Sequence, residues 1–228
     1  MDLNLARFNM IEQQIRPWEV LDQEVLDLLG VVKREQFVAP SQMQLAFTDV
    51  ELPILGGDSA TGETMWTPRL EARVLQELAV RAHDHVLMIG VGSGYLAALF
   101  AHRADRVVAV EIAPSIKALA EENLRRSGTV NVLLKDGDGA RGFGTDRFDV
   151  IVLTGSTPVL PAELKAQLKP HGRLFAVVGD APAMTATLVT RDGTDGNSGN
   201  GSAFAEIGLF ETNLKPLRNA VQPTRFQF

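Results

Sequence analysis

The sequence predicts an α/β fold in which a mostly parallel sheet of seven strands carries helices on both faces. Between residues 86 and 178, short apolar runs alternate with amphipathic segments of helical period, a pattern typical of parallel sheets with helical crossovers. After residue 186, two strand-like runs flank the turn-rich stretch RDGTDGNSGNGS, which predicts an antiparallel C-terminal hairpin. The length of 228 residues suits one large domain, or a domain with an extension.

Residues 1–66 are expected to form a helical and irregular extension that covers a cleft in the main domain. Apolar residues at helical spacing over 3–15 predict a helix, which we expect to end near Pro17. Asp22 is a suitable N-cap for a second helix. The segment 37–61 is rich in Pro and Gly and is expected to be irregular.

Residues 67–228 are expected to form one compact domain. Thr67 suits the N-cap of its first helix and Pro68 the first helical position, where a missing N–H costs nothing. The remaining elements follow from the alternating pattern. The predicted strands are 86–90, 106–111, 130–135, 148–153, 172–178, 186–191 and 203–212, and helices are expected through 96–100, over 114–126 and over 161–168.

The composition excludes several kinds of chemistry. The chain has no cysteine, which rules out disulfides, thiolate catalysis and zinc–sulfur sites, and no metal site is predicted. The net charge is −6 and the basic residues are scattered, so we expect no binding of nucleic acid. No segment approaches the roughly 18–20 apolar residues of a membrane span. We therefore expect a cytoplasmic protein, of an oligomeric state that the sequence does not indicate.

The glycine-rich stretch MIGVGSGY (88–95) predicts a ligand site between a buried strand and a helix. Gly90, Gly92 and Gly94 permit a tight turn and let the backbone approach a ligand near the helix N-terminus. The alternative is a glycine-rich turn without a ligand. Tyr95 stands where a dinucleotide fingerprint has its third glycine, and no phosphate-binding P-loop motif occurs.

Two acidic residues follow the next two predicted strands. Glu111 ends one of them, where a carboxylate can accept hydrogen bonds from a ribose diol. Asp138 lies in KDGDGARG (135–142), where the edge of an adenine would be placed. A solvated acid and a polar turn are the alternatives. Together with the glycine loop, these residues predict a nucleoside crevice that suits S-adenosylmethionine better than NAD.

Several segments occur in the order found in protein-L-isoaspartate O-methyltransferases: MIEQQIRPWEVLDQEVL, REQFVAP, AFTDVELPI, GETMWTP, IGVGSGYLAALFA, DGDG and VLTGSTPVLPAELKAQLKPHGRLFAVVG. From about residue 9 to residue 190 the sequence resembles this family, which implies a Rossmann-like class I methyltransferase fold. The resemblance also implies S-adenosyl-L-methionine as methyl donor, S-adenosyl-L-homocysteine as product, and an isoaspartyl residue of a damaged protein or peptide as acceptor. The cofactor contacts that it implies are Gly90, Val91, Gly92, Ser93, Gly94, Glu111, Ile112, Asp138 and Gly139.

The sequence departs from the pattern of the family at two positions. Met88 stands where methyltransferases of this class usually carry Glu or Asp. The stretch before the first domain helix reads T-I-S-x-P in the family, and its hydroxyls line the acceptor site. Here Thr64 and Pro68 match, but Trp66 replaces the Ser. An indole has one hydrogen-bond donor and no acceptor, and it occupies far more volume than the Ser side chain. Trp66 is therefore either a wall of the acceptor site or buried packing.

Methyl transfer to a carboxylate does not require a general base, because a carboxyl group with a pKa of about 4 is ionised at neutral pH. Alignment and exclusion of water are then the main contributions of the protein. Ser156 and Thr157 supply hydroxyls in a loop where the family commonly has alanines. We hypothesise that the acceptor site is rebuilt around Trp66, Ser156 and Thr157, beside Thr64, and that the substrate differs.

Three functions remain open on the sequence. The first is methylation of isoaspartyl residues, which the resemblance favours over the whole chain. The second is a class I methyltransferase of the same lineage with another acceptor, which Trp66 favours. The third is a catalytically inactive protein that keeps the fold and binds the cofactor or a partner, which Met88 and Trp66 together favour.

Overall fold

The structure, a computed structural model, describes residues 2–56, 59–193 and 203–223. Within these residues seven strands form the main sheet: β3 (His85–Ile89), β4 (Arg106–Glu111), β5 (Val132–Asp136), β6 (Phe148–Leu153), β7 (Leu168–Asp180), β8 (Ala183–Arg191) and β9 (Phe204–Thr212). Their order is β5-β4-β3-β6-β7-β8-β9. The pairs from β5 to β7 are parallel, and β7–β8 and β8–β9 are antiparallel. The predicted sheet and its C-terminal hairpin are confirmed.

The strand order places a ligand crevice beside β3. The chain continues from β3 to β4 on one side, and β6 pairs with β3 on the other side. In an open parallel sheet, the crevice outside the carboxyl ends of the strands at such a reversal binds ligands. The loops that follow β3, β4 and β6 are therefore the ones that the fold brings to a common site.

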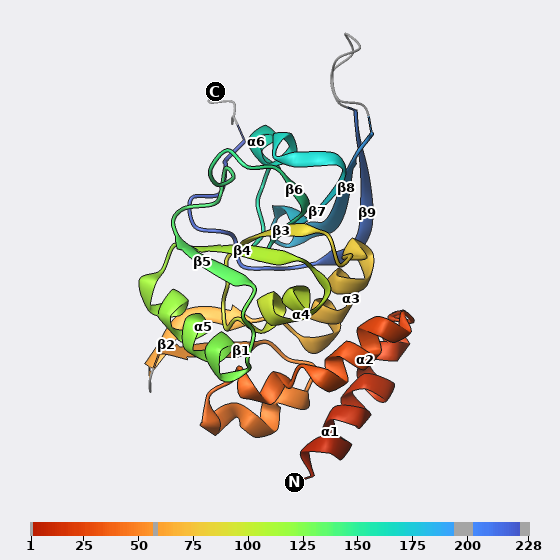
Figure 1. The fold of residues 1–228 in the computed structure, drawn as a ribbon, viewed down its shortest axis with the longest axis vertical. Coiled ribbons are helices and arrows are strands. Elements are labelled where there is room, and N and C mark those ends of the chain that lie inside the picture. Colours follow the sequence, from red (N-terminus) through yellow and green to blue (C-terminus); the bar gives the residue numbers. More distant parts are fainter. Residues whose placement is uncertain (1, 57–58, 194–202, 224–228) are drawn as a thin grey trace.

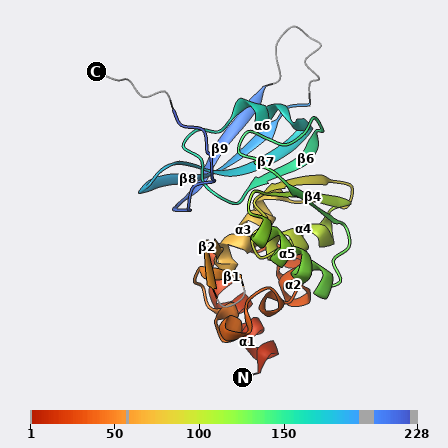
Figure 2. The same ribbon diagram turned by 90° about the vertical axis from the view of Figure 1, so that its left-hand side faces the viewer.

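Helices cover both faces of the sheet, as predicted. Figures 1 and 2 show α3 (Pro68–Leu78), α4 (Tyr95–Arg103) and α5 (Pro114–Arg126) on one face and the short α6 (Ala162–Ala166) on the other. Successive residues of β3 alternate between the two layers: Val86 and Met88 belong to the core under α3–α5, while Leu87 and Ile89 belong to the core under α6. This burial on both sides explains the unbroken apolar run of the strand.

The N-terminal extension packs beside the helices of the first layer. It contains α1 (Leu3–Met10), a helical continuation through η1 (Ile11–Ile15) and η2 (Arg16–Trp18), α2 (Gln23–Val31), and the short turns η3 (Arg34–Gln36) and η4 (Pro40–Phe47). Asp22 caps α2 as predicted, accepting the backbone N–H of Glu24 at 2.9 Å. The helical turns pass Pro17, because Pro needs no N–H donor at the start of the 3₁₀ turn η2. No described helix combines the length and the hydropathy that crossing a bilayer requires.

The prediction of an irregular segment over 37–61 is wrong. Besides η4, it contains β1 (Leu52–Gly56) and the start of β2 (Ser59–Met65), which form an antiparallel hairpin. Leu52 and Ile54 are buried, whereas the intervening Pro53 is exposed. This alternation with a period of two is short, and a two-stranded ribbon tolerates the proline that conceals it in the sequence.

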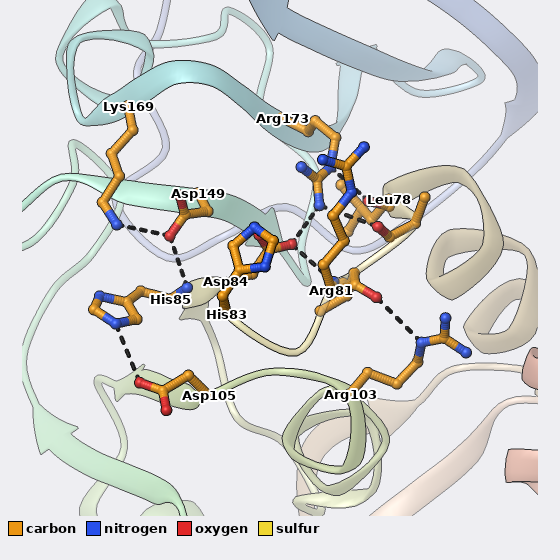
Figure 3. Close-up of polar contacts among 12 residues, drawn as sticks. Leu78, Arg81, His83, Asp84, His85, Arg103, Asp105, Asp149, Lys169 and Arg173 are labelled. Carbon is orange, nitrogen blue, oxygen red and sulfur yellow. Dashed lines mark hydrogen bonds and ion pairs between the residues drawn. The ribbon is translucent and has the colours of Figure 1, made fainter.

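The opposite end of the sheet carries a network of paired charges (Figure 3). The carboxylate of buried Asp84 lies 2.5 Å from the Arg173 guanidinium. Lys169 Nζ and the backbone N–H of His85 both donate to Asp149, at 2.7 and 2.8 Å. His85 begins β3, so these pairs lie at the amino ends of the parallel strands, away from the predicted crevice.

Candidate cofactor and acceptor site

A cavity opens at the carboxyl ends of β3, β4 and β6. Its volume is about 1010 Å³, part of it open to solvent. Gly92, Glu111 and Asp138, the three features expected to converge, all line it. The β1–β2 hairpin and the segment 213–220, which follows β9, also contribute to its walls. The crevice implied by the strand order is therefore present, and the extension and the C-terminal segment complete it.

The loop after β3 can take its shape only because glycine stands at its first position. Gly90 has a φ of +87°, and a Cβ there would lie 2.2 Å from the Thr154 hydroxyl oxygen. That hydroxyl is fixed in place, since it is within 2.8 Å of the Ile89 carbonyl oxygen and 3.0 Å of the Gly90 carbonyl oxygen. The backbone of the loop is thus the surface that a ligand meets.

Glu111 joins this loop to the next strand. The residue is 7% exposed, and its carboxylate accepts the backbone N–H of Val91 at 3.0 Å through Oε2 and that of Ala113 at 3.0 Å through Oε1. Each carboxylate oxygen can accept a second hydrogen bond. Because the side chain also lines the cavity, it has acceptor capacity left for a pair of hydroxyl groups. The residue therefore fits a ribose diol.

The loop after β5 contributes a carboxylate to the cavity, and the loop after β4 contributes an apolar side chain. Asp138 accepts the Ala140 backbone N–H at 2.9 Å and the Asn219 side-chain amide at 2.8 Å. Ile112 is 37% exposed and lines the same cavity. A Cβ on Gly139 would come within 2.5 Å of Ile89, so the loop packs closely on β3. An apolar side chain beside a carboxylate can receive the face and the amino edge of a purine.

Trp66 is both a wall of the cavity and buried packing. Its side chain lines the cavity but is only 6% exposed. The indole N–H donates to the Thr154 carbonyl at 3.1 Å, and the ring meets Phe175 edge-to-face with centroids 6.4 Å apart. Arg34 donates to the Trp66 carbonyl at 2.5 Å. The one donor of the indole is therefore used within the protein.

The cavity carries an excess of negative charge. Glu71, on α3, lines it and is buried beside Arg34, whose Nε lies 3.0 Å from its carboxylate. Burial raises the pKa of Glu71 to about 7, despite the opposing effect of Arg34. A cavity of this charge favours a cationic ligand such as a sulfonium. The carboxylates that line it are Glu51, Glu63, Glu71, Glu111 and Asp138.

Comparison with known proteins shows which family the chain belongs to. The model of the family described as protein-L-isoaspartate(D-aspartate) O-methyltransferase matches residues 6–201. The chain belongs to this family. A protein-L-isoaspartate O-methyltransferase of Methanoculleus marisnigri is 39% identical, over 82% of this chain and 84% of that relative. One from Syntrophobacter fumaroxidans is 36% identical, over 81% and 84%.

Solved structures of isoaspartate methyltransferases share the fold. One superposes with a TM-score of 0.77 at 24% identity and covers 92% of this chain, which spans 65% of that protein. Another, from Plasmodium falciparum and in complex with S-adenosyl-L-homocysteine, has a TM-score of 0.72 at 18% identity, over 92% of this chain and 96% of that one. The Rossmann-like methyltransferase fold expected from the sequence is confirmed.

All but one of the expected cofactor contacts of this isoaspartate methyltransferase family member line the cavity. The exception is Gly94, whose φ is +88°. A Cβ there would lie 3.3 Å from the Ala120 carbonyl oxygen and from Leu124, so this glycine permits α4 to pack on α5. Those that line the cavity are Gly90, Val91, Gly92, Ser93, Glu111, Ile112, Asp138 and Gly139.

The structure places Ser156 and Thr157 away from the cavity, where the hypothesis of a rebuilt acceptor site expected them together with Trp66. Both side chains are buried and neither lines the cavity. Ser156 Oγ donates to the Leu214 carbonyl at 2.9 Å, and Thr157 Oγ1 to the Val159 carbonyl at 2.7 Å. The C-terminal segment covers this loop and uses its polar groups. Thr64 does line the cavity, with its hydroxyl donating to Glu51 at 3.0 Å.

Three charged residues at the cavity could not be predicted from the sequence. Glu63 pairs with Lys215 at 3.0 Å and with Arg218 at 2.9 Å. The basic residues lie in KPLR near the end of the chain, where no motif marks them. Only the folded chain brings that segment next to β2. Among the described residues, no group of three His, Asp or Glu side chains is arranged to hold a metal ion.

Proposed function

We propose that this protein transfers the methyl group of S-adenosyl-L-methionine to the carboxylate of L-isoaspartyl residues in damaged proteins or peptides. One observation carries the proposal: Gly92, Glu111 and Asp138 line a single cavity in a chain of the isoaspartate methyltransferase family. The S-adenosyl-L-homocysteine complex of the Plasmodium relative supports the identity of the cofactor. A role in protein repair in the cytoplasm is part of the proposal and rests on the sequence and the family.

The residues present fit this cofactor. In the proposal, Glu111 binds the ribose diol with its remaining lone pairs, and Ile112 and Asp138 hold the adenine. The loop at Gly90 and Gly92 approaches the methionine portion. Residues 1–66 act as an extension that covers the cleft of the cofactor-binding domain 67–228, and the hairpin lining of the cavity supports this division.

The bound cofactor supplies an electrophilic methyl group on a positively charged sulfur. The protein contributes alignment and exclusion of water, because an ionised carboxylate needs no deprotonation and charge disappears in the transition state. Thr64 and Trp66 are proposed to bound the acceptor end of the cavity. The Trp66 N–H is engaged by Thr154, so this residue shapes the cavity and leaves the acceptor oxygens free.

A different acceptor is the second candidate. Trp66 occupies the position of the family Ser, and its indole donor is not free to orient a carboxylate. The hydroxyl of Thr64 is shared with Glu51, which further reduces the neutral donors at this end. These contacts favour an acceptor that is positioned by groups other than hydroxyls.

Transfer of tritiated methyl groups tests the proposal. Purified protein and labelled S-adenosylmethionine are incubated with an isoaspartyl peptide, with the matching normal aspartyl peptide as control. The proposal predicts base-labile label in the isoaspartyl peptide alone. Label in other molecules of a cell lysate, with none in the peptide, supports the second candidate. No transfer together with no calorimetric binding of the cofactor indicates an inactive member of the family.

A further inference from the structure

The mouth of the cavity holds a pair of cations that the proposed reaction does not use. Lys215 and Arg218 lie on the C-terminal segment, and their side chains are 53% and 50% exposed. Both reach one carboxylate, that of Glu63 on β2, at 3.0 and 2.9 Å. They are the only cationic side chains among the described residues that line the cavity.

Glu63 is held by these two contacts as an anion. Burial would raise the pKa of Glu63, but hydrogen bonds from Lys215 and Arg218, together with their charges, lower it below the ordinary value. The side chain is 25% exposed, so water and solutes reach the cluster. A partly exposed ion pair contributes little to stability, which makes exchange of one carboxylate for another inexpensive.

We propose that Lys215 and Arg218 form a subsite for a second carboxylate of the acceptor, and that Glu63 occupies this subsite until the acceptor displaces it. This inference rests on the proposed function and specifies its substrate class: an acidic peptide, in which a side-chain carboxylate neighbours the residue that is methylated.

The charge balance of the reaction shows why the subsite holds a second carboxylate and not the reacting one. A carboxylate oxygen forms a bond to the methyl carbon while the carbon–sulfur bond breaks with its electron pair going to sulfur, so the carboxylate loses its charge. Cations bound to the reacting carboxylate would stabilise the ground state more than the transition state and slow the step. Cations bound to a different carboxylate improve binding without this cost.

The acidic lining of the cavity explains why such a subsite helps an anionic acceptor to bind. Glu51, Glu111 and Asp138 repel an incoming peptide carboxylate while favouring the cationic cofactor. Lys215 and Arg218 offset that repulsion at the entrance. An acceptor with no second carboxylate lacks this contribution.

Two variants that break the same ion pairs give opposite results if the subsite exists. Glu63→Gln removes the carboxylate that competes for both cations, although Lys215 still donates to the Gly62 carbonyl at 2.8 Å, whereas Lys215→Met with Arg218→Met removes the cations. A control variant with Arg125→Met and Lys165→Met breaks one ion pair formed by an Arg and one formed by a Lys. Neither residue lines the cavity. Initial rates are measured on two isoaspartyl peptides, one flanked by Glu and one by Gln.

We expect wild-type protein to show a KM for the Glu peptide about tenfold below that for the Gln peptide, as charge-assisted contacts would give. Lys215→Met with Arg218→Met abolishes the difference, Glu63→Gln enlarges it, and kcat changes little in either. The control behaves as wild type. The preference of the wild type declines as salt is raised.

The inference is overturned if the wild type does not distinguish the peptides, or if both cavity variants shift KM in the same direction. The latter would identify the cluster as a clasp that only holds the C-terminal segment. Fluorescence anisotropy with the labelled Glu and Gln peptides, with and without S-adenosylhomocysteine, gives the same comparison without turnover. If no isoaspartyl peptide is methylated, the proposed function fails, and the anisotropy of the variants still decides the inference.

Discussion

The carboxylate of Glu111, at the end of β4, accepts the backbone N–H of Val91 in the neighbouring loop at 3.0 Å. This contact fixes the distance between the glycine loop and the strand that carries the ribose acid. One side chain therefore determines the shape of the cavity and also makes a proposed contact to the cofactor.

Replacing Glu111 tests that double role. Glu111→Gln keeps the size of the side chain but replaces one acceptor oxygen with an amide donor, which opposes the N–H of either Val91 or Ala113. We expect the affinity for S-adenosylhomocysteine to fall about ten- to a hundredfold, as for loss of a hydrogen bond to a charged group. Calorimetry measures it. Glu122→Gln, on the exposed face of α5, serves as the control, and equal affinities for the two variants would contradict the assignment.

A pair of glycine variants tests the geometry of the loop. Gly90→Ala places a Cβ 2.2 Å from the Thr154 hydroxyl at a φ of +87°, so we expect a loss of stability of roughly 1–3 kcal/mol. Binding of S-adenosylhomocysteine should weaken as well. Gly30→Ala, in α2 with no atom within 4 Å of the new Cβ, should instead stabilise the protein by up to about 1 kcal/mol. Urea denaturation compares them, and similar effects would show that the loop is not constrained.

Trp66 gives a prediction about packing. Trp66→Phe keeps the contact with Phe175 and loses only the hydrogen bond to Thr154, which should cost about 0.5–1.5 kcal/mol. Trp66→Ser restores the residue of the family but empties a buried volume, and should cost roughly 3–5 kcal/mol, as truncation of a buried Trp does. Chemical denaturation measures both. A Ser variant as stable as wild type would mean that the indole is not part of the core.

Glu71 predicts a specific dependence of stability on pH. Its pKa is about 7 in the folded protein and 4.5 ordinarily, so between these values the folded chain holds a proton that the unfolded chain has released. The free energy of unfolding of the wild type should therefore fall, relative to that of Glu71→Gln, as the pH rises from 4.5 to 7. Denaturation of both proteins at pH 5 and pH 8 measures it. A difference that is constant, or that changes in the other direction, contradicts the prediction.

The charged network at the amino ends of the strands should affect stability alone. Asp84→Asn removes the charge that faces Arg173 in a buried setting, and should cost about 1.5–3 kcal/mol. Asp105→Asn, whose carboxylate is 60% exposed beside His85, should change stability by less than about 0.5 kcal/mol. Calorimetry should show unchanged binding of S-adenosylhomocysteine in both, because the network lies away from the cavity. Weakened binding in the folded Asp84 variant would contradict this separation.

The sequence predicts the sheet well because its strands are buried on both faces. The bounds of β4, β6 and α5 agree with those expected, since continuous apolar runs and a clear helical period mark them. The β1–β2 hairpin was missed because Pro53 and the glycines of that stretch dominate a short alternation. The hydrophobic pattern predicts a strand well where both of its faces are buried, and poorly where a two-stranded ribbon is only partly buried.

Some residues of the candidate site could likewise be predicted from the sequence, and others could not. Residues at strand ends, such as Glu111 and Asp138, could be placed from the sequence because the topology of a parallel sheet brings such ends together. The interiors of loops could not: Ser156 turns into the protein because the segment after β9 binds it. Lys215 and Arg218 reach Glu63 across more than 150 residues of sequence, and no local pattern encodes that contact.

A crystal structure of the protein grown with S-adenosyl-L-homocysteine tests the central claim most directly. The account predicts the ligand in the cavity at the carboxyl ends of β3 and β4. Its ribose hydroxyls should lie within hydrogen-bonding distance of Glu111, and its adenine between Ile112 and Asp138. A ligand bound elsewhere, or a cavity that stays empty at saturating ligand while the loop keeps its shape, would contradict it.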